Sequence, residues 1–175
     1  SKISGCKPEI MCIGNINYYF KKDKGYLTRI DRGLTSKALN LLNRFIILIK
    51  LKGNYDIFHP TYYNPYMIGR KHGTMTITVY DMIHEIFPEL LKDKTSENKK
   101  KIVHEADHII SISESTKRDI LKYYNSIPES KITVIYIGTD MKKCMDIQLK
   151  ELFPEKYIFF VGNREKYKNF AAFTS

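Results

Sequence analysis

The chain has 175 residues, of which 43% are hydrophobic and 27% are charged, and its formal net charge is +10. This length and composition predict a soluble globular protein with one well-filled core, and they exclude a disordered or fibrous chain. The longest apolar run, Phe45 to Ile49, is far too short to span a bilayer, which takes about 20 residues. The N-terminus shows no secretory signal, so we expect a cytoplasmic protein.

The cysteines exclude two further classes of protein. There are 3 of them, an odd number, and none belongs to a Cys-x-x-Cys pair. That pattern argues against a disulfide framework and against a zinc site. The cysteines are Cys6, Cys12 and Cys144.

Basic residues gather in four short segments, at 21–24, 92–101, 142–143 and 164–168. Solvated loops and helix faces are the favoured explanation for most of this charge. The alternative is attraction to an anionic partner, such as a phosphate-bearing ligand, an acidic membrane surface or nucleic acid. No helix-turn-helix, zinc-finger or ribonucleoprotein motif accompanies the charge, so we expect no nucleic-acid partner.

The first elements in chain order are a strand at 9–20 and a helix at 33–52. The helix is predicted because apolar side chains recur every three or four positions, and Gly53-Asn54 ends it. We expect this apolar face to pack in a core. The alternative is that the helix, with its basic ends, contacts an anionic membrane.

A short buried strand is predicted at 55–59, broken by Pro60 and followed by an aromatic loop at 62–66. Flat aromatic rings can cover the apolar faces of sugars, so this loop is a candidate for sugar stacking. The chain contains 13 tyrosines, and chance clustering is therefore the favoured explanation.

The next strand is predicted at 74–80, ending at Asp81, and a helix is predicted at 95–105. Three apolar runs follow, each closed by small polar or charged residues, at 108–112, 131–137 and 157–161. Strands separated by helices of about ten residues predict βαβ units, hence an α/β fold with a parallel sheet. Ligands of such sheets bind outside the carboxyl ends of the strands, so we expect the function there.

Three segments are expected from the change of pattern after the second of these runs. Residues 1–140 are expected to form one Rossmann-like domain. Residues 141–156 carry mixed charge with a Phe153-Pro154 break, and we interpret them as a linker. Residues 157–175 are then the start of a second domain.

Five ordered segments carry the most specific signal in the sequence. They are YDIFHP at 55–60, TITVYDMIHEIFPEL at 76–90, ADHIISISESTKRDI at 106–120, KITVIYIGTD at 131–140 and YIFFVGNREKYKN at 157–169. In this order and at this spacing they resemble the successive blocks of glycosyltransferase family 4 enzymes, which have the GT-B fold.

The resemblance implies a Rossmann-like parallel sheet flanked by helices, forming the acceptor-side half of a two-domain enzyme. It implies transfer of a sugar, with retention, from a nucleotide-sugar donor to a glycan or lipid-linked acceptor in surface polysaccharide synthesis. It also implies that no metal and no cofactor is needed. A lipid-linked acceptor would fit peripheral contact with the anionic inner face of a membrane.

The sequence departs from the family pattern in three places. No glycine-rich loop is found before residue 33, and the His-Asp pair of many members reads Tyr80-Asp81 here. No histidine role can therefore be carried over to that position. The paired glutamates that grip the donor in the family lie in a part of the second domain that this sequence lacks, so we do not expect this chain to transfer a sugar alone.

The resemblance assigns Arg164 and Lys168 to the leaving diphosphate of the donor, where two cations would neutralise developing charge. The alternative is a solvated basic turn. Asp81, His84 and Glu85 follow a buried strand, and one of them could orient or deprotonate the acceptor hydroxyl. The alternative is that Asp81 caps the next turn and His84 packs. A metal site made of these three residues is disfavoured because no fourth ligand is in sight.

Five more residues are expected to line the cleft: His59, Tyr80, Ser113, Gly138 and Asp140. Ser113 is also expected to be the N-cap of a helix at 114–124, although a helix N-terminus can bind an anion. Two other classes of protein stay open: a non-catalytic nucleotide-sugar or nucleic-acid binding module, and another GT-B enzyme such as an epimerase or phosphorylase.

Overall fold

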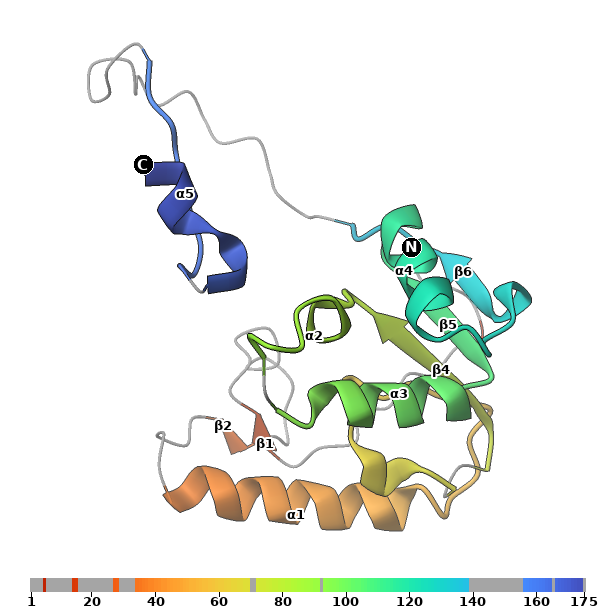
Figure 1. Cartoon of the computed structure of the whole chain (residues 1–175). Coiled ribbons are helices and arrows are strands. Elements are labelled where there is room, and N and C mark those ends of the chain that lie inside the picture. Colours follow the sequence, from red (N-terminus) through yellow and green to blue (C-terminus); the bar gives the residue numbers. More distant parts are fainter. Residues whose placement is uncertain are drawn as a thin grey trace. The chain divides into compact units, whose positions relative to one another are not determined.

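The computed structural model describes Gly5, 14–15, 27–28, 34–69, 72–91, 93–138, 156–164 and 166–174. The chain divides into two compact units. One comprises Ser1–Ile77 and Lys101–His108, and the other comprises Thr78–Lys100 and Ile109–Ser175. Figure 1 shows the order of the elements along the chain.

The main sheet has four strands in the order β3-β4-β5-β6. They are β3 (Ile57–Phe58), β4 (Thr74–Val79), β5 (His108–Ser111) and β6 (Ile132–Val134). β3 pairs with β4 in parallel, as does β5 with β6. Parallel neighbours need a crossover connection, and helices or irregular segments of this chain supply it. The predicted α/β class with a Rossmann-like parallel sheet is confirmed.

In the first unit, the start of β4 is fixed by two hydrogen bonds to one residue. Asp107 donates its backbone N–H to the carbonyl oxygen of Met75, and its carboxylate accepts the N–H of Met75, each at 2.8 Å. Gly73 lies so close to the two residues before β3 that a Cβ there would overlap the carbonyl oxygens of Tyr55 and Asp56. Only glycine therefore fits at this approach.

The first unit also contains helix α1 (Leu34–Lys50), a short 3₁₀ helix at Pro65–Met67, and a two-stranded parallel sheet of β1 (Gly14–Asn15) and β2 (Leu27–Thr28). The helix predicted at 33–52 is thus confirmed. Its predicted burial is wrong for Leu41 and Phe45, which are 68% and 62% exposed. A periodic apolar pattern shows that a helix has an apolar face, but it does not show what covers that face.

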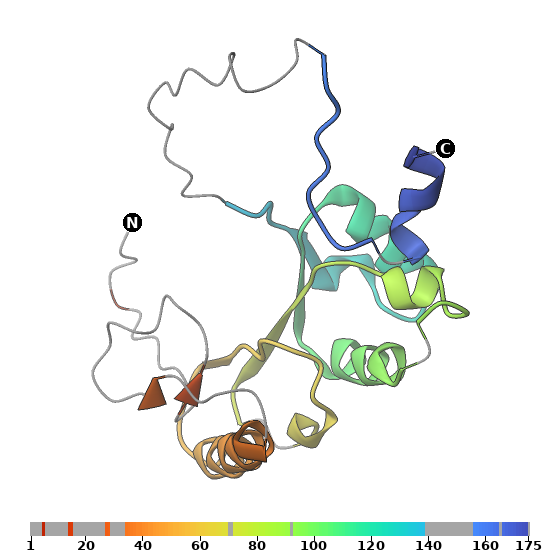
Figure 2. The same ribbon diagram turned by 90° about the vertical axis from the view of Figure 1, so that its left-hand side faces the viewer.

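The second unit holds α2 (Ile83–Ile86), the first part of α3 (Thr95–Glu105), α4 (Glu114–Tyr123) and β6. The predicted N-cap is confirmed, because the hydroxyl of Ser113 accepts the backbone N–H of Thr116 at 3.1 Å. α2 lies beside the carboxyl end of β4 in both views (Figure 1; Figure 2). The core of this unit is built from the buried residues Val79, Met82, Ile109, Ile120, Tyr124, Ile127 and Ile132.

Three of the predicted strands differ from the structure. The strand predicted at 55–59 is reduced to Ile57–Phe58, and its predicted burial is wrong for Ile57, which is 65% exposed. The strand predicted at 131–137 is shorter, since β6 ends at Val134 and the apolar side chains at 135–137 are exposed. Residues 157–161 form no strand, and their side chains are exposed. An apolar run becomes a strand only where a neighbouring strand pairs with it, and no described strand pairs with 157–161.

The last described segment continues with a 3₁₀ turn at Lys166–Lys168 and a short helix α5 (Phe170–Thr174). Most of the strand predicted at 9–20 lies outside the described residues, as does the linker predicted at 141–156 except for Lys156. The division into a domain at 1–140 and a second one from 157 stays a prediction.

Candidate functional site

The candidate site is the turn that follows β4 in the second unit. Asp81 lies two residues after the end of β4, and its carboxylate oxygen Oδ1 accepts the backbone N–H of Ile83 at 3.1 Å. This contact across two residues caps the turn into α2, as the alternative interpretation of Asp81 predicted. The side chain is still 49% exposed. Asp81 therefore shapes the turn while keeping part of its carboxylate open to solvent.

The buried side chain of Lys99 also contacts this turn. The Lys99 side chain on α3 is 1% exposed, and its Nζ donates to the backbone carbonyl of Asp81 at 3.0 Å. It also lies 2.8 Å from Oε2 of Glu85 and 3.9 Å from Oδ1 of Asp81. The solvated interpretation of the basic segment 92–101 is therefore wrong for Lys99. The spacing of Lys99 to Ile102, Val103 and Ala106, all buried, was the signal that could have identified it.

Glu85 is the other half of this buried ion pair. Its side chain is 4% exposed, and Oε1 accepts the hydroxyl of Tyr124 at 2.6 Å. Burial alone would raise the pKa of the Glu85 carboxyl. Hydrogen bonds from Lys99 and Tyr124, together with the charge of Lys99, outweigh burial and hold that pKa below its usual value. Glu85 is thus a charged carboxylate that accepts hydrogen bonds from Lys99 and Tyr124, and a further one from Ser96.

The depressed pKa of Glu85 predicts acid sensitivity. Its folded-state pKa lies below its unfolded one, so its contribution to stability is complete above the unfolded pKa of about 4.3 and is lost as the pH falls through the folded pKa. We expect the urea midpoint of the wild-type protein to fall below about pH 4. The Glu85→Gln variant should lose less stability over the same pH range. Equal slopes in both proteins would contradict this assignment.

His84 lies on the same turn of α2. Its Nε2 is 3.5 Å from Oδ2 of Asp93, while its Nδ1 is buried without a hydrogen-bond partner within the described part of the chain. The predicted packing of His84 agrees with this partial burial. No three His, Cys, Asp or Glu side chains gather into a possible metal site within the described ranges.

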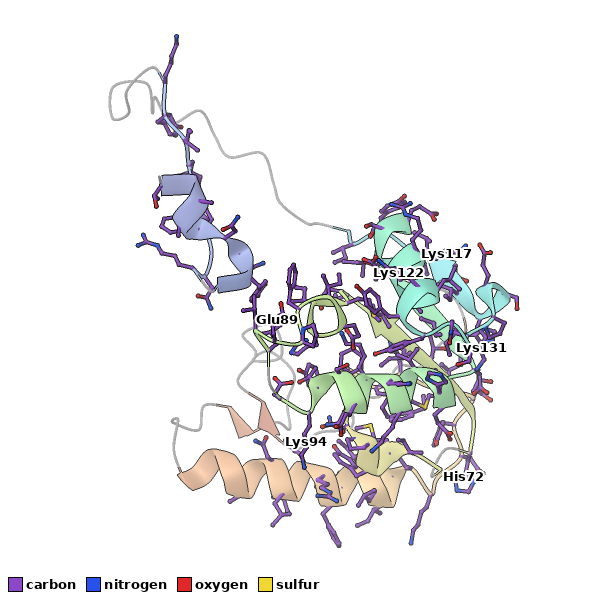
Figure 3. All side chains as sticks on the ribbon, in the orientation of Figure 1. His72, Glu89, Lys94, Lys117, Lys122 and Lys131 are labelled. Atoms are coloured by element: carbon purple, nitrogen blue, oxygen red, sulfur yellow. The ribbon has the colours of Figure 1, made fainter. Side chains whose placement is uncertain are left out.

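The N-terminus of α4 adjoins the end of β4. Thr116 Oγ1 donates to the carbonyl oxygen of Tyr80 at 3.4 Å and lies 3.0 Å from Oγ of Ser113. The structure thereby brings together Tyr80, Asp81 and Ser113, as the strand-end argument predicted. Lys117 and Lys122 lie farther along the same helix (Figure 3), and Lys117 pairs with Glu129 at 2.7 Å.

Three other residues predicted to line the cleft are Gly138, Asp140 and His59. Gly138 is exposed after β6, and Asp140 lies outside the described residues. His59 belongs to the first unit, where partial burial lowers the pKa of its imidazole. In the aromatic loop, Tyr63 is buried, and the guanidinium of Arg44 lies 4.9 Å from the ring centre of Tyr66.

Arg164 and Lys168 are described by their local surroundings. The guanidinium of Arg164 lies 4.6 Å from the ring centre of Phe170, and Nζ of Lys168 lies 5.1 Å from that of Tyr167. Phe160 also contacts Phe170, with 4.6 Å between ring centres. The aromatic contacts fix the loop that carries Arg164 against the start of α5, while Lys168 stays exposed on the 3₁₀ turn.

Two comparisons with known proteins bear on this site. Residues 20–143 match the model of a protein family described as Glycosyltransferase Family 4. The matched range includes the whole four-stranded sheet and the turn that carries Asp81. No curated protein matches the sequence.

Proposed function

The chain belongs to glycosyltransferase family 4, and on that premise we propose that it contributes the acceptor side of a sugar transfer. The donor would be a nucleoside-diphosphate sugar, the acceptor a hydroxyl of a glycan or lipid-linked glycan, and the setting surface polysaccharide synthesis. The transfer would retain the anomeric configuration of a hexose. Family membership makes the chain a glycosyltransferase domain. The donor, the acceptor, the biological setting and the retention of configuration are what we propose.

The observation that carries the acceptor side is the half-exposed carboxylate of Asp81 at the carboxyl end of a central strand. Ligands of open α/β sheets bind at that end. A carboxylate there can orient an attacking hydroxyl or accept its proton, provided that it lies within hydrogen-bond reach. The neighbouring hydroxyls of Ser113 and Thr116 bond to each other and to the backbone. Of the two acidic side chains in the turn, Asp81 is half-exposed and Glu85 is buried.

The donor diphosphate is assigned to the segment from 157 onward, which we propose as the start of a donor-binding domain. Arg164→Ala and Lys168→Ala should each lower kcat by about 100-fold, because each removes a cation from the leaving diphosphate. The check is the steady-state rate of nucleoside diphosphate release. Lys156→Ala is the matched control and should keep the wild-type rate, because Lys156 is an exposed lysine that immediately precedes this segment. Near-normal turnover in both variants would remove this assignment.

The experiment that tests the function starts with a panel of nucleoside-diphosphate sugars. We expect one of them to raise the unfolding temperature of the full-length protein and to be turned over to a free nucleoside diphosphate when an acceptor glycan is added. Stabilisation without turnover would favour the alternative, a binding module that holds the nucleotide-sugar without catalysis. Neither stabilisation nor turnover with any donor would contradict the proposal.

A peripheral contact with an anionic membrane is a second candidate, favoured by the exposed side of α1. Leu41, Phe45 and Ile49 are exposed on one face of this helix, and the sequence from 32 to 55 holds five basic and no acidic residues. An apolar stripe among basic residues suits the interface of an acidic bilayer. None of the helices described is long and apolar enough to cross a membrane.

The membrane contact predicts binding to vesicles that contain acidic lipid. We expect the protein to sediment with such vesicles at low salt and to be released at high salt, because surface charges are screened. Phe45→Ser should reduce the bound fraction about tenfold through lost apolar burial. Asn40→Ser, an exposed position on the same helix, is the control. No sedimentation at low salt would end this candidate.

A further inference from the structure

Lys99 is the buried titratable group for which the sequence pattern gave no role. It belongs to the run Asn98-Lys99-Lys100-Lys101, of which Lys100 and Lys101 are exposed while Lys99 is buried. A charged side chain is almost never fully buried unless it is paired. Lys99 is paired with Glu85, at 2.8 Å.

The ammonium joins three pieces of the second unit at one point. It donates to the carbonyl oxygen of Asp81 in the turn after β4 and to the carboxylate of Glu85 in α2. Glu85 in turn accepts the hydroxyl of Tyr124 at the end of α4. The turn that carries Asp81 is therefore tied to α3 directly and to α4 through Glu85.

The bond to the Asp81 carbonyl is the contact that matters for the site. That carbonyl belongs to the residue whose side chain faces solvent at the strand end. α2 is only four residues long, too short to hold its own shape without tertiary contacts. The N–H of Ile83 holds the Asp81 carboxylate within the turn, so the direction of the carboxylate follows the placement of the turn. Lys99 makes the charged contact that holds the turn in place.

We propose that Lys99 is a positioning residue for Asp81, which sets the orientation of the carboxylate that meets the acceptor hydroxyl. The catalytic part of this inference rests on the proposed function. The structural part, that Lys99 orders the turn from Asp81 to Phe87, stands on the contacts alone. Misplacing a catalytic group by about 1 Å is enough to cost about 100-fold in rate.

The test separates positioning from simple stability with the double variant Lys99→Met/Glu85→Gln. Removing both charges leaves no unpaired buried ion, so most of the stability lost in Lys99→Met should return. The carbonyl of Asp81 is still without its ammonium donor. Urea unfolding should therefore approach the wild-type midpoint while the turn stays loosened.

Hydrogen exchange measures the turn directly. The amides of Ile83, Glu85, Ile86 and Phe87 are bonded within it. In the double variant they should exchange about tenfold faster than in the wild type, through local opening. Lys101 is an exposed lysine on the same helix, and in the Lys101→Met variant these amides should exchange at the wild-type rate. Wild-type exchange of these amides in the double variant would overturn the inference.

Kinetics of the full-length protein, with the donor that its wild-type form turns over, test whether Lys99 acts through Asp81. The double variant should lose about tenfold in kcat with the donor KM within about twofold, and in an Asp81→Asn background it should cause no further loss. A restored midpoint with wild-type kcat, or a full additional loss in that background, would overturn the role. If the wild-type protein turns over no donor, the proposed function fails, and hydrogen exchange alone still decides whether Lys99 orders the turn.

Discussion

Replacing Lys99 with Met should lower the free energy of unfolding by about 3–5 kcal/mol, the cost of breaking a buried ion pair on one side. The substitution keeps the length of the side chain but removes the ammonium from Glu85, which is 4% exposed. The Glu85 carboxylate would then be buried without a charged partner, and hydroxyl groups such as that of Tyr124 would be its donors. Urea titration followed by circular dichroism measures the difference.

Lys101→Met is the matched control for this prediction. Lys101 is two positions away on α3 and exposed, so its loss should change the free energy of unfolding by no more than about 0.5 kcal/mol. The variants should also differ in pH dependence, because a buried unpaired carboxylate takes up a proton more readily. If Lys99→Met and Lys101→Met unfold at the same urea concentration, Lys99 is not buried in solution.

Asp81→Asn should lower kcat by about 100-fold or more, which is the usual range for a lost general base. The amide oxygen of Asn can still accept the N–H of Ile83, a bond that is 3.1 Å long in the wild type. The turn should therefore keep its shape, and the unfolding midpoint should stay near the wild-type value. A loss of rate at unchanged stability is the signature of a chemical role.

The control for Asp81→Asn is Asp56→Asn. Asp56 is also exposed, but it precedes β3 and so lies at the amino end of a strand, away from the end where ligands bind. Its loss should leave kcat within about twofold of wild type. Equal rates in the two variants, whether both normal or both reduced, would contradict the special role of Asp81.

Local signals explain what the sequence could predict. The helix at 95–105 has the predicted bounds, and Ser113 caps α4 as predicted, because apolar period and capping chemistry are set by near neighbours. The strand at 74–80 was found for the same reason, since its Thr, Val and Ile residues alternate between buried and half-buried positions. These elements also fix the turn in which Asp81 lies.

Contacts between distant residues explain what the sequence could not predict. Lys99 is 14 residues from Glu85, and Tyr124 is 39 residues from it, so the buried cluster depends on how three elements pack. The apolar run at 157–161 looked like a strand, but strand formation depends on a partner that a local pattern does not reveal. The same limit made the apolar face of α1 look like core.

The sequence likewise predicted where the site residues lie better than it predicted which of them is exposed. The strand-end argument placed Asp81, Tyr80 and Ser113 together, and the structure agrees. It could not distinguish Asp81 from Glu85, although one is half-exposed and the other carries two donors in the interior. The catalytic roles of Asp81, His84 and Glu85 stay predictions, of which we favour Asp81.

Sugar transfer at this turn is tested most directly by the rate of acceptor-dependent release of nucleoside diphosphate, compared between wild type and Asp81→Asn. We expect release by the full-length wild-type protein with at least one nucleoside-diphosphate sugar, and a rate about 100-fold lower in the full-length variant. Release that is equally fast in both proteins would contradict the assignment of the acceptor side to the end of β4.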